Sequence, residues 1–275
     1  MKNKVEMKTK TCPILGHQMD AVFSANLLNK YDVQYFYCEE SGLLQTEVPY
    51  WLDEAYDQAI AATDTGILRR NLLHLFRSLP LLNALTDKQS KLLDVGGGYG
   101  ILTRMLRDVG YDCYSYDKYC QNLFADGFEP EKSFSANVLF AFEVFEHIED
   151  PMTFLQENFS KYSCKTMILS TQTFDGPIPD KDWWYYSLTT GQHITFYQPK
   201  SLKILAEKNA CFYYPLGKGF HLITDKHLSK INQVIFSNRV LSVLQALYLI
   251  IKQRKHSKTQ LDSNAMKEKI KSAER

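Results

Sequence analysis

The sequence carries almost no net charge. Its 32 lysine and arginine residues are balanced by 31 aspartate and glutamate residues, which leaves a formal charge of +1. A dedicated nucleic-acid binder needs an excess of basic residues, so this balance argues against that class of protein. Hydrophobic residues make up 45% of the chain and charged residues 23%, which excludes a disordered or fibrous protein.

The sequence also lacks a long hydrophobic run. The longest one, Val240 to Ile251, includes Ser242 and Gln245 and is shorter than the roughly 20 residues that span a bilayer. Lysines near the N-terminus are not followed by the apolar stretch of a secretory signal. Six cysteines are dispersed through a chain whose size requires no disulfides. We therefore expect a cytoplasmic protein in a reducing compartment.

Glycine is scarce, at 13 of 275 residues, but its distribution is uneven. Four of the thirteen fall within five positions, Gly96, Gly97, Gly98 and Gly100. Glycine adopts left-handed backbone conformations and permits close approach of another group. The cluster therefore indicates a specialised loop.

Three regions differ in pattern. Residues 1–60 are rich in aromatic and turn residues, and we expect them to form a small N-terminal subdomain. Residues 61–225 alternate short apolar runs with helical stretches and contain a loop-like insertion at 172–198. Residues 226–275 are helical by pattern and end in a polar, lysine-rich segment, which predicts a helical C-terminal extension.

The pattern of residues 61–225 predicts an α/β domain. Leucines at helical spacing predict a helix that begins near Asp64 and stops at Pro80. Further helices are predicted at 101–110, after the Asp150-Pro151 pair and at 201–209. Strands are predicted at 91–95, 111–117, 138–142 and 166–170, with an antiparallel hairpin at 211–214 and 220–224. Strands that alternate with helices predict a mostly parallel sheet covered on both faces.

The glycine cluster lies where the first of these strands joins a helix, a position at which backbone N–H groups can receive a ligand. A dinucleotide site would place its third glycine at position 101, which is Ile101, and no Lys-Ser/Thr pair follows as in a P-loop. Asp94 precedes the loop, and Asp117 ends the second strand at the spacing of a residue that accepts hydrogen bonds from a ribose. Together these residues favour a nucleoside-binding site.

Three segments resemble class I S-adenosylmethionine-dependent methyltransferases. Residues 92–100 are similar to the first motif of that superfamily, hydrophobic-hydrophobic-Asp-x-Gly-x-Gly-x-Gly. Residues 141–151, which read AFEVFEHIEDP, resemble the segment after its fourth strand. Residues 191–202 are similar to a histidine-bearing segment of a bacterial subgroup associated with sugar or glycan modification. The resemblance implies a Rossmann-like, doubly wound sheet with S-adenosylmethionine as its cofactor.

The resemblance also implies roles for particular residues. Asp94 and the glycine loop would hold the methionine part of the cofactor, Asp117 would bind the ribose, and Asp126 is the nearest candidate for an adenine contact. Phe142 and Glu143 would border the transferred methyl group. The implied cofactor-binding set is Asp94, Gly96, Gly98, Gly100, Asp117, Phe142 and Glu143.

The acceptor site is assigned to the histidines and the aromatic insertion. His193 and His147 are the candidate bases, because a neutral imidazole accepts a proton near pH 7. For each histidine a structural role is the alternative. The insertion carries four consecutive aromatic residues, at most about two of which can face a substrate. We assign substrate contact to Trp183, Trp184, Tyr186 and Gln192.

Two further groups have alternative interpretations. Arg69 and Arg70 would meet a phosphate of a nucleotide sugar or, as we favour, pair with nearby carboxylates. The N-terminal segment resembles the two C-x-x-C zinc knuckles of related sugar methyltransferases but keeps only Cys12 and Cys38, with Leu15 and Ser41 in the second positions. A tetrahedral zinc site would need a replacement such as His17, so we expect no metal.

The sequence thus predicts a methyltransferase that acts on a small-molecule acceptor, a carbohydrate, nucleotide sugar or glycan, with methylation of oxygen favoured over nitrogen or carbon. The alternatives are a non-catalytic S-adenosylmethionine-binding scaffold and a tRNA or protein methyltransferase. For the helix at 240–251 we favour burial against the domain or a second copy of the chain over contact with a membrane surface.

Overall fold

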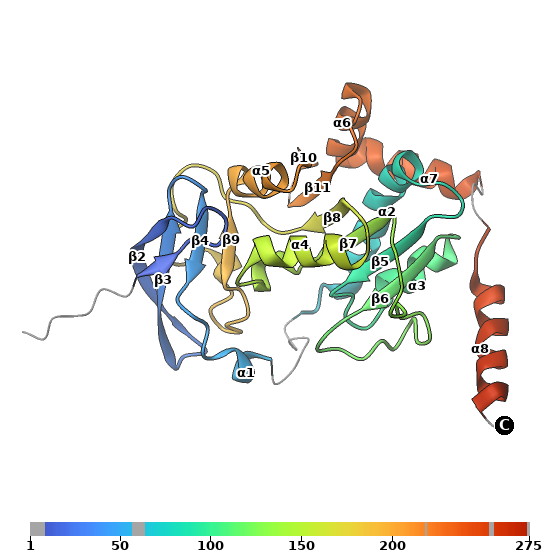
Figure 1. Cartoon of the computed structure of the whole chain (residues 1–275), viewed down its shortest axis with the longest axis horizontal. Helices are drawn as coiled ribbons and strands as arrows, with labels where there is room; N and C mark the ends of the chain where they lie inside the picture. The colour runs from blue at the N-terminus through green and yellow to red at the C-terminus, as the bar shows by residue number, and fades with distance from the viewer. Residues whose placement is uncertain (1–8, 57–63, 218, 253–255, 274–275) are drawn as a thin grey trace, which may run out of the picture.

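The computed structural model describes residues 9–56, 64–217, 219–252 and 256–273. Its centre is a six-stranded sheet with the order β10-β11-β8-β7-β5-β6 (Figure 1). Strands β5 (Lys91–Val95), β6 (Asp112–Tyr116), β7 (Val138–Phe142) and β8 (Thr166–Ser170) are parallel, whereas β10 (Phe212–Pro215) and β11 (Phe220–Thr224) form an antiparallel hairpin. This topology confirms the predicted α/β fold.

Helices cover both faces of this sheet because the strands are apolar on both sides. On one face, α4 (Pro151–Lys161) and α5 (Pro199–Lys208) pack on a core that includes Leu93. On the other face, α2 (Ile67–Leu85) and α3 (Ile101–Asp108) pack on a core that includes Leu92. Adjacent residues of one strand therefore belong to opposite cores, as the alternation of strand side chains requires.

Of three predictions about where the helices begin and end, one is confirmed and two are wrong. Asp150 caps α4 through its contact with the Thr153 N–H, as predicted. Pro80 does not end α2, which continues to Leu85 because the buried side chains of Leu81 and Leu82 anchor the last turn in the core. Asp64 is not the N-cap of α2; that position is Gly66.

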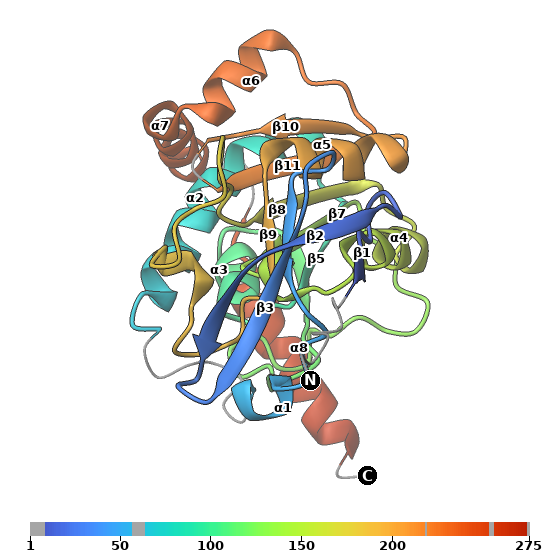
Figure 2. The same ribbon diagram turned by 90° about the vertical axis from the view of Figure 1, so that its left-hand side faces the viewer.

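A second sheet lies beside the first. Its order is β1-β2-β3-β4-β9, and all its pairs are antiparallel (Figure 2). The first four strands come from the N-terminal region, β1 (Lys10–Thr11), β2 (Gln18–Leu27), β3 (Tyr31–Cys38) and β4 (Leu43–Thr46), and the short helix α1 (Leu52–Ala55) follows. Strand β9 (Thr195–Tyr197) comes from the end of the insertion. The sheet therefore joins the N-terminal region to the main domain, and the predicted domain boundaries at 60 and 225 remain predictions.

In the N-terminal segment that resembles two zinc knuckles, the two half-motifs lie next to each other. Cys12 Sγ lies 3.3 Å from Ser41 Oγ, and both residues are buried. His17, the predicted replacement ligand, is exposed and pairs with Glu40 instead. Packing and hydrogen bonding thus connect the two half-motifs.

The C-terminal region forms α6 (Lys230–Ser237), α7 (Arg239–Ile251) and α8 (Thr259–Ala273). In α7 the described chain buries only Ser242, Ala246 and Leu249, so the domain covers one side of the helix. Burial of its other apolar residues against a second copy of the chain remains a prediction. In the described part of the chain no single helix is long and apolar enough to cross a membrane; α6 and α7 meet the length and composition criteria only as a pair bent by 97°.

Candidate cofactor and acceptor site

The glycine loop connects β5 to α3. Gly96, Gly98 and Gly100 have φ angles of 75°, 56° and 80°, in the left-handed region that favours glycine. A Cβ atom on Gly96 would lie 2.6 Å from Val144 Cγ2, and one on Gly97 would lie 2.4 Å from Ser115 Oγ. The loop is therefore packed so closely against its neighbours that larger residues would displace it.

Two carboxylates flank this loop as predicted. Asp94 is buried at the end of β5, where desolvation and the nearby Asp117 raise its pKa to about 7. One oxygen of Asp117 accepts a hydrogen bond from Gly98 N–H at 2.9 Å, and the other accepts from the N–H groups of Tyr119 and Cys120. Asp117 therefore fixes the loop to the turn after β6, and its carboxylate retains acceptor capacity for a ribose hydroxyl.

Phe142 is the last residue of the neighbouring strand β7 and Glu143 is the first residue after it, and their side chains face different surroundings. The Phe142 ring stacks on His74, with ring centroids 4.2 Å apart, and on Phe220. Glu143 has a φ angle of 54° and accepts a hydrogen bond from the Ser170 hydroxyl. Burial and the nearby Glu146 raise the pKa of Glu143 to about 6. Phe142 thus supports the site from the core, and Glu143 belongs to its polar surface.

A cavity of about 190 Å³ opens beside Glu143. Three arginines from two helices line it, Arg70 and Arg77 on α2 and Arg239 on α7. Burial and the nearby Arg239 lower the pKa of Arg77 to about 10, so its guanidinium remains charged at neutral pH. Arg70 forms a bidentate ion pair with Asp64, which agrees with the pairing to a nearby carboxylate that we favoured from the sequence. Positively charged side chains therefore line one side of the cavity.

Of the four residues assigned to substrate contact, one lines the cavity and three do not. Trp184 is 73% exposed and lines the cavity. Trp183 packs against Phe174 and the other aromatic residues of the insertion. Tyr186 is fully buried and donates to the Pro179 carbonyl, and Gln192 donates to the Ala55 carbonyl. These three side chains hold the insertion in place and lie outside the set that lines the cavity.

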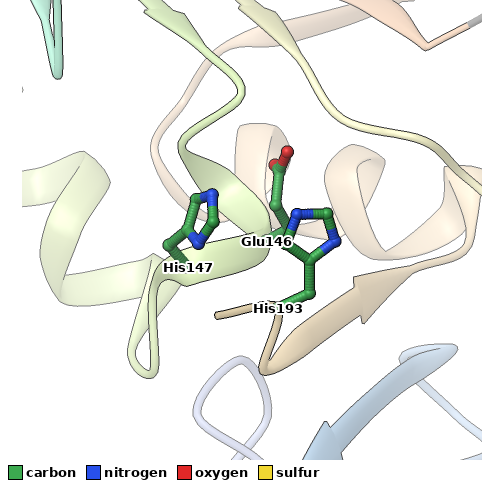
Figure 3. Close-up of side chains that lie close together, drawn as sticks. All are labelled: Glu146, His147 and His193. Carbon is green, nitrogen blue, oxygen red and sulfur yellow. The ribbon is translucent and has the colours of Figure 1, made fainter. Parts of the chain in front are cut away.

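The two candidate bases lie next to each other. The rings of His147 and His193 are 4.9 Å apart between centroids, and the Glu146 side chain lies close to both (Figure 3). His147 Nδ1 is 2.9 Å from the Gln192 carbonyl, and His193 Nδ1 is 2.8 Å from the Tyr185 carbonyl. Burial and the neighbouring His147 lower the pKa of His193 to about 3, so this imidazole is neutral at pH 7.

Several residues of the site were missed from the sequence. Tyr185, His74, Arg77 and Arg239 line the cavity, and Glu146 accompanies the histidines. Part of the signal was present, because Arg70, His74 and Arg77 recur at i, i+4 and i+7 and so lie on one side of the predicted helix. Arg239 carried no such signal, since its position depends on how α7 packs.

The parallel sheet, the glycine loop and the flanking aspartates define a class I S-adenosylmethionine-dependent methyltransferase. The methyltransferase domain family matches residues 67–210, which is more than half of the chain. The chain belongs to this family. No curated protein matches the sequence.

Solved structures that are similar to the chain include several methyltransferases. The mitomycin 7-O-methyltransferase MmcR is 14% identical, with a TM-score of 0.41, over 63% of this chain and 59% of that one. The magnesium protoporphyrin IX methyltransferase ChlM from Synechocystis PCC 6803, solved with S-adenosylhomocysteine, is 14% identical, with a TM-score of 0.42, over 62% of this chain and 90% of that one. CalO1, a methyltransferase in calicheamicin biosynthesis, is 13% identical, with a TM-score of 0.41, over 63% of this chain and 60% of that one. The chain thus spans about three fifths of the length of two of these proteins.

The residues present fit the cofactor of this class, S-adenosylmethionine. The buried Asp94 offers a carboxylate at the root of the loop, the glycines leave no side chain in front of it, and Asp117 offers oxygens on its far side. These are the groups that an amino-acid moiety and a ribose require.

Proposed function

We propose that this protein transfers a methyl group from S-adenosylmethionine to an oxygen of a small, anionic carbohydrate acceptor such as a sugar phosphate or nucleotide sugar. The observation that carries this proposal is the cavity beside Glu143, which three arginines line. Guanidinium groups bind phosphate oxygens with charge-assisted hydrogen bonds. Trp184 and Tyr185 line the same cavity, and aromatic rings stack on sugars.

The cavity lies near the glycine loop. Strands β5 and β7 are neighbours in the sheet, and the Val144 side chain contacts the position of Gly96. Glu143, one residue earlier, lines the cavity. An acceptor bound there would therefore lie close to a cofactor held by the loop.

In the proposed reaction an acceptor oxygen attacks the methyl carbon of the cofactor's sulfonium. The carbon–oxygen bond forms as the carbon–sulfur bond breaks, the hydroxyl proton is released, and S-adenosylhomocysteine is the second product. The protein's contribution is alignment: the loop and its aspartates orient the cofactor, and the arginines orient the acceptor. Glu143 lies at the boundary between the two ligands, where its carboxylate can accept a hydrogen bond from an acceptor hydroxyl.

Calorimetric titration with S-adenosylhomocysteine tests the cofactor site. We expect the parent protein to bind and the affinity to fall by roughly 10-fold or more in Asp94→Ala and in Asp117→Ala, because each loses at least one hydrogen bond to a ligand worth about 1.5 kcal/mol or more. Asp175→Ala, which removes an exposed carboxylate from another loop, is the matched control. Absence of binding to the parent protein would contradict the assignment.

The acceptor is tested with radiolabelled S-adenosylmethionine and a panel of neutral sugars, sugar phosphates and nucleotide sugars. We expect turnover with phosphorylated acceptors. In Arg239→Ala, which changes an exposed cavity arginine, KM for that acceptor should rise while affinity for S-adenosylhomocysteine is unchanged. Turnover of neutral sugars alone, or an unchanged KM, would exclude the anionic acceptor.

A further inference from the structure

Three side chains next to the proposed acceptor cavity converge on one point. They are Glu146 and His147 on the short turn η1 (Phe145–His147) and His193, two residues before β9. One ligand atom from each lies within 4.8 Å of the others (Figure 3). These two distant segments of the chain are brought together because Ile194 N–H donates to the Glu146 carbonyl and joins them.

Glu146 has an unusual environment for a carboxylate. Its residue is 0% exposed, and neither carboxylate oxygen has a hydrogen-bond partner among the residues that the structure describes. A buried acidic group without a partner is strongly destabilising, so such groups in native proteins pair with a cation or coordinate a metal. The described surroundings of this carboxylate therefore lack a positively charged partner at bonding distance.

Both histidines are oriented as metal ligands usually are. The Nδ1–H of His147 donates to the Gln192 carbonyl, and that of His193 donates to the Tyr185 carbonyl. A carbonyl oxygen can only accept, so each Nδ1 carries a proton, and Nε2 is the ring nitrogen left to bind a metal. Metal-binding histidines typically donate their second ring nitrogen to a carbonyl or carboxylate in this way.

We propose that Glu146, His147 and His193 bind a divalent transition-metal cation, and that this cation holds an oxygen of the acceptor. Two imidazoles and one carboxylate, without a thiolate, suit manganese, iron, cobalt, nickel or zinc. Ligand atoms about 2.0–2.2 Å from a metal lie roughly 3 Å apart, which small side-chain rotations can reach from the present spacing. Three protein ligands leave coordination positions for water or substrate.

The role of the cation in binding the acceptor rests on the proposed function. Glu143 lines the acceptor cavity and lies close enough to Glu146 and His147 to interact with both electrostatically. Tyr185 also lines the cavity, and its ring contacts that of His193 at 4.7 Å between centroids. Together the carboxylates of Glu143 and Glu146 balance the charge of a divalent cation. A hydroxyl bound to such a cation loses its proton more readily, which favours attack by oxygen.

Cobalt(II) is the probe for the binding site itself. The full-length protein is treated with a chelator, dialysed and titrated with Co²⁺ by calorimetry and visible absorption. We expect one equivalent to bind with a d–d absorption band. In His193→Ala and Glu146→Gln the affinity should fall by more than about 100-fold, beyond the effect of losing an outer-shell partner. His17→Ala is the control, because His17 also lies beside a carboxylate but on the exposed N-terminal segment.

Two results of the cobalt titration would overturn the metal site. Absence of Co²⁺ binding to the parent protein overturns the proposal even if a variant fails to fold. Binding that persists in both site variants and disappears in His17→Ala would place the metal in the N-terminal segment and also overturns it. Thermal unfolding with and without Co²⁺ gives a second readout, since a ligand that binds only the folded state raises Tm in the parent but not in a folded site variant.

Titration with S-adenosylhomocysteine in the same samples distinguishes failure of the two proposals. Cofactor binding without Co²⁺ binding would leave the methyltransferase assignment in place and exclude the metal site. Co²⁺ binding without cofactor binding would leave the metal site in place and exclude the methyltransferase assignment. If both ligands bind, Co²⁺ or Mn²⁺ should restore methyl transfer to the chelator-treated parent protein but not to His193→Ala; equal activity of the chelated and reloaded parent would remove the cation from acceptor binding.

Discussion

Burial determines the protonation of individual histidines in this protein. His221 lies in β11, where Tyr213 Oη is 2.9 Å from Nδ1 and the Nε2–H donates to the Thr171 carbonyl at 3.1 Å. These contacts satisfy a neutral imidazole completely, with Nδ1 as acceptor and Nε2 as donor. Burial lowers the pKa of His221 to about 4. A proton added in the folded state would therefore have to displace the hydrogen bond from Tyr213.

This environment predicts acid destabilisation. In the unfolded chain His221 has a pKa near 6.5 and takes up a proton before the folded protein does, so its contribution is present above pH 6.5 and is lost as the pH falls toward 4. Between pH 7 and pH 5 the free energy of unfolding should fall by about 2 kcal/mol on account of this residue. Urea unfolding at the two pH values measures the loss.

His221→Gln removes the titrating group and should make the pH dependence shallower by that amount, although the variant is less stable at pH 7. His227→Gln is the control, because His227 is exposed. Equal slopes for the parent and His221→Gln would show that another group is responsible.

Among the secondary-structure elements, α8 is joined to α3 by a buried carboxylate, that of Asp262. Asp262 is 5% exposed and accepts hydrogen bonds from both Arg104 and Arg107 on α3, at 2.7–2.8 Å. Burial alone would raise the pKa of Asp262, but the hydrogen bonds from these arginines hold it below its ordinary value. Arg107 is itself 4% exposed, so α8 supplies the charge that balances a buried guanidinium.

We therefore expect Asp262→Asn to release α8 from the domain. Among the described residues the change leaves the buried Arg107 with only the partly exposed Asp112 as an acidic partner, at 3.1 Å, and it should lower the free energy of unfolding by about 3 kcal/mol. Hydrogen exchange of the amides in residues 259–273 should accelerate by about 10-fold or more, since a local opening easier by about 1.4 kcal/mol has that effect. Unchanged exchange would show that other contacts of α8 suffice.

Asn264→Ala is the matched control for this experiment, because Asn264 is exposed on the same helix. Affinity for S-adenosylhomocysteine should be retained in both variants, since Asp262 bonds to Arg104 and Arg107 on α3 and not to the glycine loop, Asp94 or Asp117. That retention separates detachment of one helix from unfolding of the domain.

At the scale of the whole molecule, α7 presents an apolar face that nothing in the described chain covers. Val240, Leu244 and Ile251 are 67%, 57% and 76% exposed. Soluble monomers rarely leave several large apolar side chains in contact with water on adjacent turns. The opposite side of the helix is bound to α2 through Ala246 and Leu249, so the exposed face is held in a fixed orientation.

From this exposure we expect the chain to self-associate through α7. Sedimentation velocity should show a dimer for the parent protein and a monomer for Leu244→Glu, because a buried carboxylate would oppose the contact. The control is Leu261→Glu, the same substitution at a leucine of α8 that is 67% exposed. A monomeric parent protein that co-sediments with anionic vesicles would instead assign this face to a membrane surface.

The sequence by itself determined the central domain. Strands β7 and β8 were predicted at their observed residues because a continuous apolar run bounded by polar residues has few alternatives to a buried strand. The glycine loop was predicted for a similar reason, since its left-handed backbone conformations require glycine at fixed positions. Such signals are local, and they depend on the intrinsic preferences of residues that are neighbours in the chain.

Only the tertiary structure decided which distant segments meet. It assigned residues 195–197 to the N-terminal sheet, placed Arg239 opposite Arg70 and Arg77, and joined His193 to Glu146. None of these contacts follows from local preference, because each depends on how completed elements pack and on which buried polar groups remain to be satisfied. The clustered glycines thus mark the proposed cofactor loop, and long-range packing builds the cavity proposed for the acceptor.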